Sequence, residues 1–265
     1  MGKALEIISG SASAPGATLT ALTMASGDSL TIRNFENGSA HLLTAWPTGK
    51  TTLGALQIRS PRMHDNVRGI QVPNPVTPSR IPIFSPYLQK LVPQDQLSVL
   101  ISGSAGAGEL MLASLLVFYE DLPGNDAKLI TPDELKSKGV DVMTVQNSIT
   151  AATGPNYTGA QAINTTNDLM KANTDYALIG YEVSVKCAAV GYRGSDTSNL
   201  RLGGPGYPGE NSDTRNWFIK LSQLTGFPCI PVFNSANKSN TFIDVQQDEA
   251  AAATVITSYF VQLGG

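Results

Sequence analysis

Side chains that could do acid–base or nucleophilic chemistry are few in this sequence. It has two histidines, His41 and His64, so a histidine-based catalytic triad must use one of them. His41 lies in the alternating run SAHLLTAW and His64 in the turn PRMHDN. Asp65 follows His64, but neighbouring residues on a strand point to opposite faces and make no shared site. We therefore expect His41 on the polar face of a strand and His64 in a turn.

The two cysteines, Cys187 and Cys229, do not complete a metal-binding pattern. A zinc site needs about four ligands, and both histidines lie far from these cysteines in the sequence. We expect buried free thiols in a chain that is made in a reducing cytoplasm. A disulfide between the two cysteines remains an alternative, because their spacing does not decide it.

Glycoside hydrolysis needs two carboxylates that face each other across about 5 to 10 Å. No spacing in the sequence points to such a pair, and most candidates lie at strand ends or in loops: Glu109, Glu120, Asp121, Asp175, Glu182, Asp244, Asp248 and Glu249. Aromatic residues make up only 7% of the chain, and Trp46 and Trp217 are far apart, which argues against a stacking platform for sugars or bases. We expect both tryptophans to be core or interface anchors.

Two glycine-containing stretches resemble phosphate-binding loops. VLISGSAGAGELML, Val99 to Leu112, has glycines in the order G-x-x-G-x-G, whereas the dinucleotide fingerprint is G-x-G-x-x-G at the start of a helix. TGKTT, Thr48 to Thr52, resembles the end of a P-loop, but Thr44 stands where that motif requires glycine. We expect the first stretch to be a hairpin loop between two strands.

Composition narrows the class of protein further. The 265 residues suffice for one large or two ordinary domains. A net charge of −3 without a cluster of Lys or Arg argues against direct binding of nucleic acid. Charged residues are 15% of the chain, against about 25% in typical soluble domains. This suits faces that are covered by neighbours, although an all-β protein rich in polar turns is the alternative. We expect no enzyme, and no catalytic, cofactor-binding or metal-ligating residue.

The first half of the sequence predicts about eight short strands, a spacing typical of a β-sandwich or barrel. They are expected at residues 17–25, 29–35, 40–46, 53–60, 67–72, 80–84, 96–102 and 109–122. A short helix is expected in SPYLQKLV, which begins at Ser85. A second helix is predicted by the capping box of Thr131 and Glu134, with Pro132 at its start and Gly139 at its end.

Segments of the second half repeat segments of the first, in the same order. ALQIRSP (Ala55 to Pro61) matches EVSVKCA (Glu182 to Ala188), and GIQVPNPV matches NLRLGGPG. VFYEDLPG matches YFVQLGG at the end of the chain, so that Leu122 aligns with Leu263. The loop ISGSAGAGELML then corresponds to VFNSANKSNTFIDV, which has lost the glycines. A self-similarity of this kind predicts a duplicated fold.

These patterns predict an all-β protein of two consecutive eight-stranded jelly rolls, at residues 1–124 and 141–265, joined by a linker with a short helix at 125–140. Such a chain resembles the double jelly-roll major capsid proteins of tailless icosahedral viruses with an internal membrane, the tectivirus-like and corticovirus-like lineage. The resemblance lies in architecture rather than in a family motif.

The resemblance implies a non-enzymatic structural protein whose homotrimers form pseudo-hexameric capsomers of an icosahedral virion. The expected partners are other copies of the chain, penton or minor capsid proteins, and the surface of the inner membrane. Residues 1–16 and the loop Gly203 to Asp213 would then be contacts on the membrane side and the outer side. The alternatives are a carbohydrate-active or carbohydrate-binding β-sandwich protein, and a minor virion protein such as a spike base or cement protein.

Overall fold

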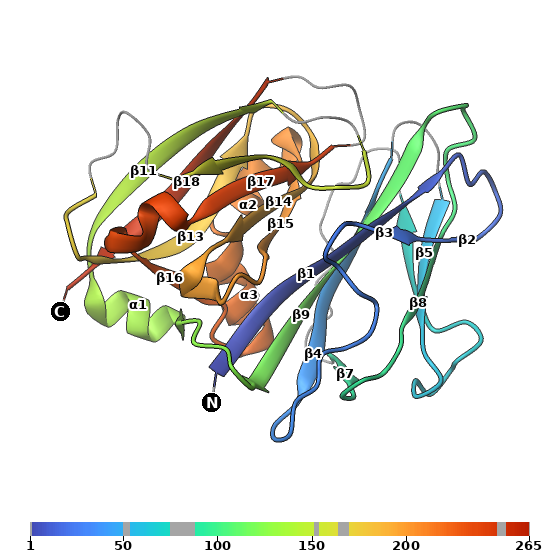
Figure 1. Cartoon of the computed structure of the whole chain (residues 1–265), viewed down its shortest axis with the longest axis horizontal. Helices are drawn as coiled ribbons and strands as arrows, with labels where there is room; N and C mark the ends of the chain where they lie inside the picture. Colours follow the sequence, from blue (N-terminus) through green and yellow to red (C-terminus); the bar gives the residue numbers. More distant parts are fainter. Residues whose placement is uncertain are drawn as a thin grey trace.

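A computed structural model describes residues 2–49, 54–74, 88–150, 154–163, 170–247 and 253–264. The described residues are mainly β-strands that pair antiparallel in four sheets, which confirms the all-β class (Figure 1). Strands of the first 122 residues pair only among themselves in this part of the chain, and so do the strands from residue 129 onwards.

Two sheets form the first half. Its strands are β1 (Gly2–Ser13), β2 (Thr20–Ala21), β3 (Thr23–Met24), β4 (Ala40–Thr48), β5 (Gly54–Arg59), β6 (Ile70–Asn74), β7 (Gln89–Leu91), β8 (Ser98–Ile101) and β9 (Leu110–Leu122). One sheet has the order β3-β1-β9-β4-β7 and the other the order β2-β8-β5-β6. Apolar side chains such as Ile8, Leu56 and Leu115 fill the space between them.

The second half has the same plan and more helix. Its strands are β10 (Leu129–Ile130), β11 (Gly139–Thr150), β12 (Thr158–Ala162), β13 (Asp175–Val183), β14 (Cys187–Arg193), β15 (Leu202–Gly206), β16 (Ile230–Asn234), β17 (Phe242–Gln246) and β18 (Ala253–Leu263). The sheets have the orders β10-β16-β13-β18-β11 and β12-β17-β14-β15. Helices α1 (Pro132–Lys138), α2 (Asn211–Thr214) and α3 (Trp217–Thr225) accompany them, with short 3₁₀ turns at Ser195–Thr197, Pro208–Glu210 and Ser235–Asn240.

The pairing order is identical in the two halves. The series β1-β9-β4-β7 corresponds to β11-β18-β13-β16, and β2-β8-β5-β6 corresponds to β12-β17-β14-β15. Leu122 pairs with Gly2 and Leu263 with Gly139, so these two leucines occupy the same place, as the sequence comparison predicted. The match of GIQV with NLRL also agrees, since β6 and β15 hold the same position in their sheets.

Two of the predicted correspondences are wrong by one strand. ALQIRSP begins in β5, whose counterpart is β14, whereas EVSVKCA begins at the end of β13. VFNSANKSNTFIDV joins β16 to β17, but the stretch around Gly103 joins β8 to β9. Because β8 and β9 belong to different sheets, that stretch is a crossover between sheets and not a hairpin loop. Short apolar strands have similar sequences, so an alignment between the two halves is easily displaced by one strand.

The predicted capping box is confirmed at the start of α1. Thr131 Oγ1 accepts a hydrogen bond from the Glu134 backbone N–H at 3.2 Å, and Glu134 Oε2 accepts one from the Thr131 N–H at 2.8 Å. Gly139 ends the helix as expected, but with φ −67° and ψ 129° rather than in a left-handed conformation. The chain therefore passes directly from α1 into β11.

Several other expected elements differ from those in the structure. Gln89–Leu91 is the strand β7 and not part of a helix, while residues 85–87 and the predicted strand 80–84 lie outside the described residues. In the predicted strand 29–35 the structure has one isolated bridge, Thr31 to Gln96. Within residues 1–16, Gly2–Ser13 form β1, with Ala4 to Ala12 all buried, and the expected membrane-side contact stays a prediction. The expected outer loop Gly203 to Asp213 begins within β15, which is buried throughout.

The four sheets stack in one order along the molecule (Figure 1). The sheet of β1, β9 and β4 lies in the middle, with its own core on one face and β14 and β15 on the other. On this second face, apolar side chains of the first half join the core of the second half: Leu5, Ile7, Leu43, Trp46, Leu116 and Phe118. Both faces of β1 and β9 are therefore buried, which explains their nearly continuous apolar sequences.

Gly180 in β13 offers a test of how the helices pack on this frame. A Cβ atom added there would lie 2.3 Å from the carbonyl oxygens of Thr214 and Arg215 at the α2–α3 junction. We expect Gly180→Ala to lower the free energy of unfolding by about 1–3 kcal/mol, because backbone atoms must move to admit the methyl group. Urea unfolding measures this. Gly209→Ala is the control, since nothing lies within 4 Å of its added Cβ. Equal stability of the two variants would contradict the described packing.

Candidate functional site

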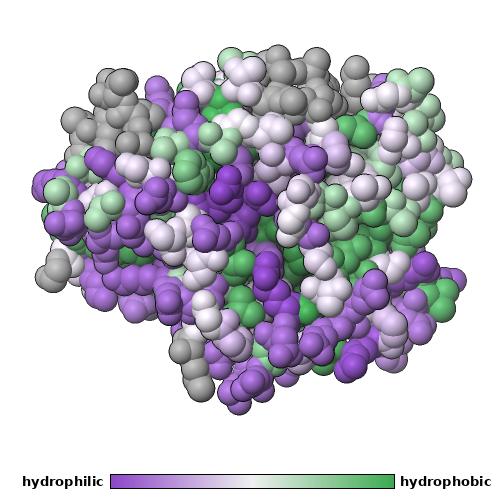
Figure 2. All heavy atoms as spheres, viewed as in Figure 1, coloured by the Kyte–Doolittle hydropathy of each residue, from purple (hydrophilic) through white to green (hydrophobic). Residues whose placement is uncertain are grey.

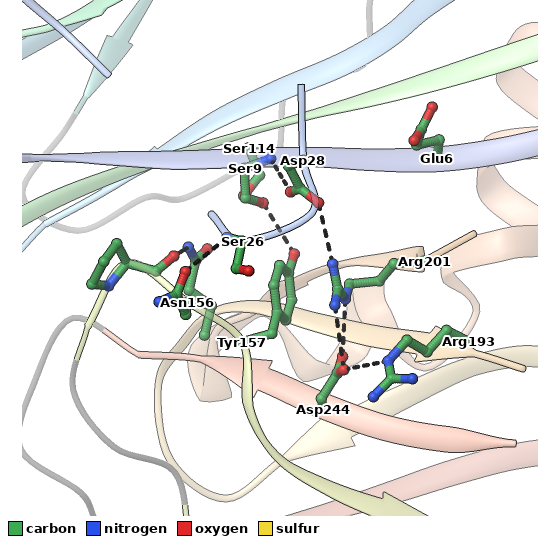
Figure 3. Close-up of polar contacts among 12 residues, drawn as sticks. Glu6, Ser9, Ser26, Asp28, Ser114, Asn156, Tyr157, Arg193, Arg201 and Asp244 are labelled. Atoms are coloured by element: carbon green, nitrogen blue, oxygen red, sulfur yellow. Dashed lines mark hydrogen bonds and ion pairs between the residues drawn. The ribbon is translucent and has the colours of Figure 1, made fainter. Parts of the chain in front are cut away.

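A network of charged and polar side chains crosses the interface between the two halves (Figure 3). At its centre is Arg201, which directly precedes β15. Its Nη1 lies 3.3 Å from Asp28 Oδ1 of the first half, and its Nε lies 3.1 Å from Asp244 Oδ1 of β17. The guanidinium stacks on the ring of Tyr157, 3.7 Å from the ring centre. One arginine thus binds a carboxylate from each half.

The second-half side of the network is held by Arg193 and Gly191. Arg193 Nε donates to Asp244 Oδ2 at 2.9 Å, so Asp244, which is 2% exposed, has two arginine partners. Gly191 faces the same group. A Cβ atom there would lie 2.5 Å from Arg201 Cδ and 2.8 Å from Asp244 Oδ1. Because Gly191 has no side chain, Arg201 and Asp244 can pack directly against the backbone of β14.

On the first-half side, the network binds the part of the β1 edge that β3 does not cover. Ser9 donates its backbone N–H to Asp28 Oδ2 at 2.7 Å, and its hydroxyl lies 2.8 Å from Ser114 Oγ and 3.0 Å from the Tyr157 hydroxyl. Ile7 donates its N–H to the Arg201 carbonyl at 2.8 Å. The second half of the chain thus supplies part of the hydrogen-bond partners for the backbone groups at the edge of β1.

A second ion pair lies beside the first. Arg33 Nε donates its one N–H to both carboxylate oxygens of Glu6 in β1, at 2.8 and 2.9 Å, and Nη2 donates to Glu6 Oε1 at 2.5 Å. Glu6 also accepts a hydrogen bond from the Tyr119 hydroxyl at 3.1 Å. A polar cavity of about 140 Å³ lies among Glu6, Asp28, Arg33 and Arg201. Three carboxylates therefore meet three arginines at the interface, which balances the charge.

Asp28 is the group whose titration the interface alters most clearly. Burial raises its pKa from 3.8 to about 6, since the charged form loses its hydration. The Ser9 N–H and Arg201 oppose this increase, whereas Glu6 and Asp244 add to it by repulsion. Burial also raises the pKa of the Tyr157 hydroxyl, which remains protonated.

His41 marks the opposite, apolar part of the interface. Its ring lies 4.7 Å from that of Phe227, which in turn stacks on Phe118 at 4.4 Å. Neither ring nitrogen has a hydrogen-bond partner among the described residues, and Glu120 Oε1 is 3.8 Å from Nε2. Burial lowers the pKa of His41. The expected polar-face position is therefore wrong, because the second half covers that face.

The remaining predicted residues are placed as follows. His64 is exposed in its turn, as expected. Cys187 and Cys229 are free and buried, which confirms the thiol prediction over the disulfide. Trp46 Nε1 donates to the Ala188 carbonyl across the interface and Trp217 Nε1 to the Gly203 carbonyl, both at 2.8 Å, so both tryptophans are buried anchors.

Only one of the candidate carboxylates, Asp244, belongs to the network. Glu182 pairs with Arg215 and Asp175 with Lys128, while Asp248 and Glu249 lie outside the described residues. Glu6, Asp28, Arg193 and Arg201 were not predicted from the sequence. For Glu6 the available signal was a single acidic residue inside an apolar run, in ALEII.

Two amides of the glycine-rich stretch are already used within the fold. Gly103 donates its N–H to the Gly16 carbonyl at 2.7 Å, and Glu109 donates to the Gly106 carbonyl at 3.0 Å. Among the described residues, no cluster of three or more His, Cys, Asp or Glu could hold a metal ion. No helix in the same residues has the length and apolar character to cross a membrane.

Comparisons with known proteins do not show a family for this chain. No known protein family and no curated protein matches the sequence. Among solved structures, the chain aligns with the crystal structure of the PBSX exported protein XepA. The alignment covers 97% of this chain and 86% of that one, at 10% identity and a TM-score of 0.22. A likeness this weak carries no argument about fold or function.

The Arg201 network should be essential for joining the halves. We expect Arg201→Met to lower the free energy of unfolding by about 3–5 kcal/mol, because it leaves Asp28 and Asp244 buried with too few partners. Chemical denaturation measures the loss. Arg215→Met, which removes an exposed partner of Glu182, is the control and should change stability far less. Similar losses in both variants would show that the network contributes no more than a surface ion pair.

The pKa of Asp28 predicts a pH dependence of stability. The folded chain holds this proton more tightly than the unfolded chain, so protonation stabilises the fold as the pH falls through about 6. As the pH rises from about 4 to 7, the wild type should lose up to about 3 kcal/mol relative to Asp28→Asn. Denaturation of both proteins across this range gives the difference. Parallel curves would show that Asp28 titrates normally.

Proposed function

We propose that this chain is a non-enzymatic viral capsid protein of the double jelly-roll type, whose copies assemble into pseudo-hexameric trimers of an icosahedral shell. One observation carries the proposal: the strand order β1-β9-β4-β7 with β2-β8-β5-β6 occurs twice in one chain. Two four-stranded antiparallel sheets in this order form a jelly roll, an architecture used by viral capsid domains. The proposed units are residues 1–124 and 141–265, with the linker between them.

The contact between the two halves supports assembly into a ring. The β1-β9-β4 face of the first half lies against the β14-β15 face of the second, so unlike faces meet. The faces that would repeat this contact between chains are the outer face of β5 and β8 and that of β11 and β18. Such head-to-tail contacts generate closed rings when the rotation permits. Three chains of two units each would make a ring of six.

The surface of the chain suits a protein that is covered by its neighbours. Charged residues are scarce, and Figure 2 shows apolar side chains gathered over the first half, on the right of the view. The largest charged network is buried between the halves and already paired, which favours an adhesive role over a reactive one. The neighbours would be other copies, penton or minor capsid proteins, and the inner membrane of the virion.

The size of the purified protein tests the proposal. We expect analytical ultracentrifugation to give three times the chain mass of 27.9 kDa, and electron microscopy to show particles with a pseudo-hexagonal outline. A stable monomer that binds or cleaves a glycan would instead establish the carbohydrate-active alternative. A protein present in only a few copies per virus particle would establish the spike-base or cement alternative.

A further inference from the structure

We propose that the turn of residues 60–69 in one copy docks on the exposed edge of β11 in the next copy. The inference rests on the proposed ring of six units and names the surfaces that close it between chains. The partner is a second copy of this chain, and its contacting segment is the connection between β5 and β6.

The contact inside the chain supplies the template. Arg201 directly precedes β15 and accepts the N–H of Ile7 from the edge of β1. Gly69 directly precedes β6, the counterpart of β15, and β11 is the counterpart of β1. Repeating the internal contact between two chains therefore places the end of the turn 60–69 beside β11, as Asn199, Leu200 and Arg201 lie beside Glu6 and Ile7 of β1.

The turn is held in a fixed conformation with an apolar residue at its surface. Asp65 Oδ1 accepts the N–H groups of Val67 and Arg68 at 3.0 and 2.8 Å, and Gly69 donates to the Asp65 carbonyl at 3.0 Å with φ +58°. Arg59 Nη1 donates to the Val67 carbonyl. Val67 is nevertheless 68% exposed. Because the turn already has a fixed conformation, docking of its exposed valine would cost little conformational entropy.

The edge of β11 lacks the cover that β1 has. Along β11, Gly139 to Val142 are all exposed, whereas Ala4 to Ala12 of β1 are buried. Val140 and Val142 are 64% and 61% exposed, on a strand that ends its sheet. A long exposed edge with apolar side chains is a surface on which another chain can pair.

The positions and charges of the exposed residues agree with this docking. Six large hydrophobic side chains are exposed in the described part of the chain, and three lie on these two surfaces: Val67 on the turn, and Val140 and Val142 on β11. The turn also carries exposed Arg62 and Arg68, while Asp141 is exposed on β11. Asp141 points to the other face of the strand from Val142, so in the proposed contact the opposite charges would meet at the rim of the apolar patch.

Thiol crosslinking tests the contact in the full-length chain. Val67→Cys and Val142→Cys are combined in one protein and treated with a short thiol-to-thiol crosslinker. We expect covalent trimers on a denaturing gel. A mixture of the two single variants should give covalent dimers, because residue 67 of one copy meets residue 142 of the next. Each single variant alone, and the wild type with its two buried cysteines, should remain uncrosslinked.

The outcomes separate this inference from the proposed function. Trimers in ultracentrifugation without crosslinking of the double variant would overturn the docking and leave the ring intact. A monomer would overturn both. Crosslinking of a single variant to itself would indicate a two-fold contact and overturn the docking.

A charge exchange gives a second, independent measurement. Arg68→Glu should weaken trimer association roughly tenfold, because it places like charges together at the contact. Asp141→Arg in the same chain should restore the association. Equal weakening by the single and the double variant would contradict the pairing of Arg68 with Asp141.

Discussion

The burial of the β1-β9-β4 sheet on both of its faces is the constraint on which the rest of the structure depends. One face needs the core of the first half and the other needs the second half, so neither half is complete alone. The polar edge of that sheet cannot be covered by apolar side chains, because the backbone of β1 must still find partners. Arg201 and Asp28 solve this by bringing a carbonyl and a carboxylate to the N–H groups of Ile7 and Ser9. The ion pairs therefore lie where the edge of β1 meets the second half of the chain.

The charge network has the form expected of an interface that must be specific as well as stable. Burying an arginine between two carboxylates has an unfavourable desolvation free energy. Good geometry and complete hydrogen bonding are needed to offset it. The apolar part of the interface, around Trp46 and Phe118, could tolerate shifts, whereas Arg201 fixes one register by contacting Asp28, Asp244 and Tyr157 together. Apolar burial therefore supplies the adhesion, and the network supplies the alignment of the halves.

Local patterns predicted the local features well. Most strands of the first half, the capping box at Thr131 and the burial of both cysteines follow from alternation, spacing and residue type. The N-terminal strand was not predicted because polar and apolar residues do not alternate in ALEIISG. A strand that is buried on both faces has no such alternation. The Arg201 network was missed for a different reason. Asp28 and Arg201 are 173 residues apart, and only the stacking of the two halves brings them together. No periodicity in a single segment encodes such a pair.

Comparison of β1 with β11 shows how one strand position adapts to two environments. The residues that β1 turns toward the second half are Leu5 and Ile7, as apolar as a domain core. The exposed part of β11 instead mixes valines with Asp141 and Thr144. Permanent burial within a chain favours apolar side chains, whereas a face that must be stable in water before it meets a partner keeps polar residues among its apolar ones. The same strand position is therefore apolar where the chain itself covers it and mixed where it is exposed.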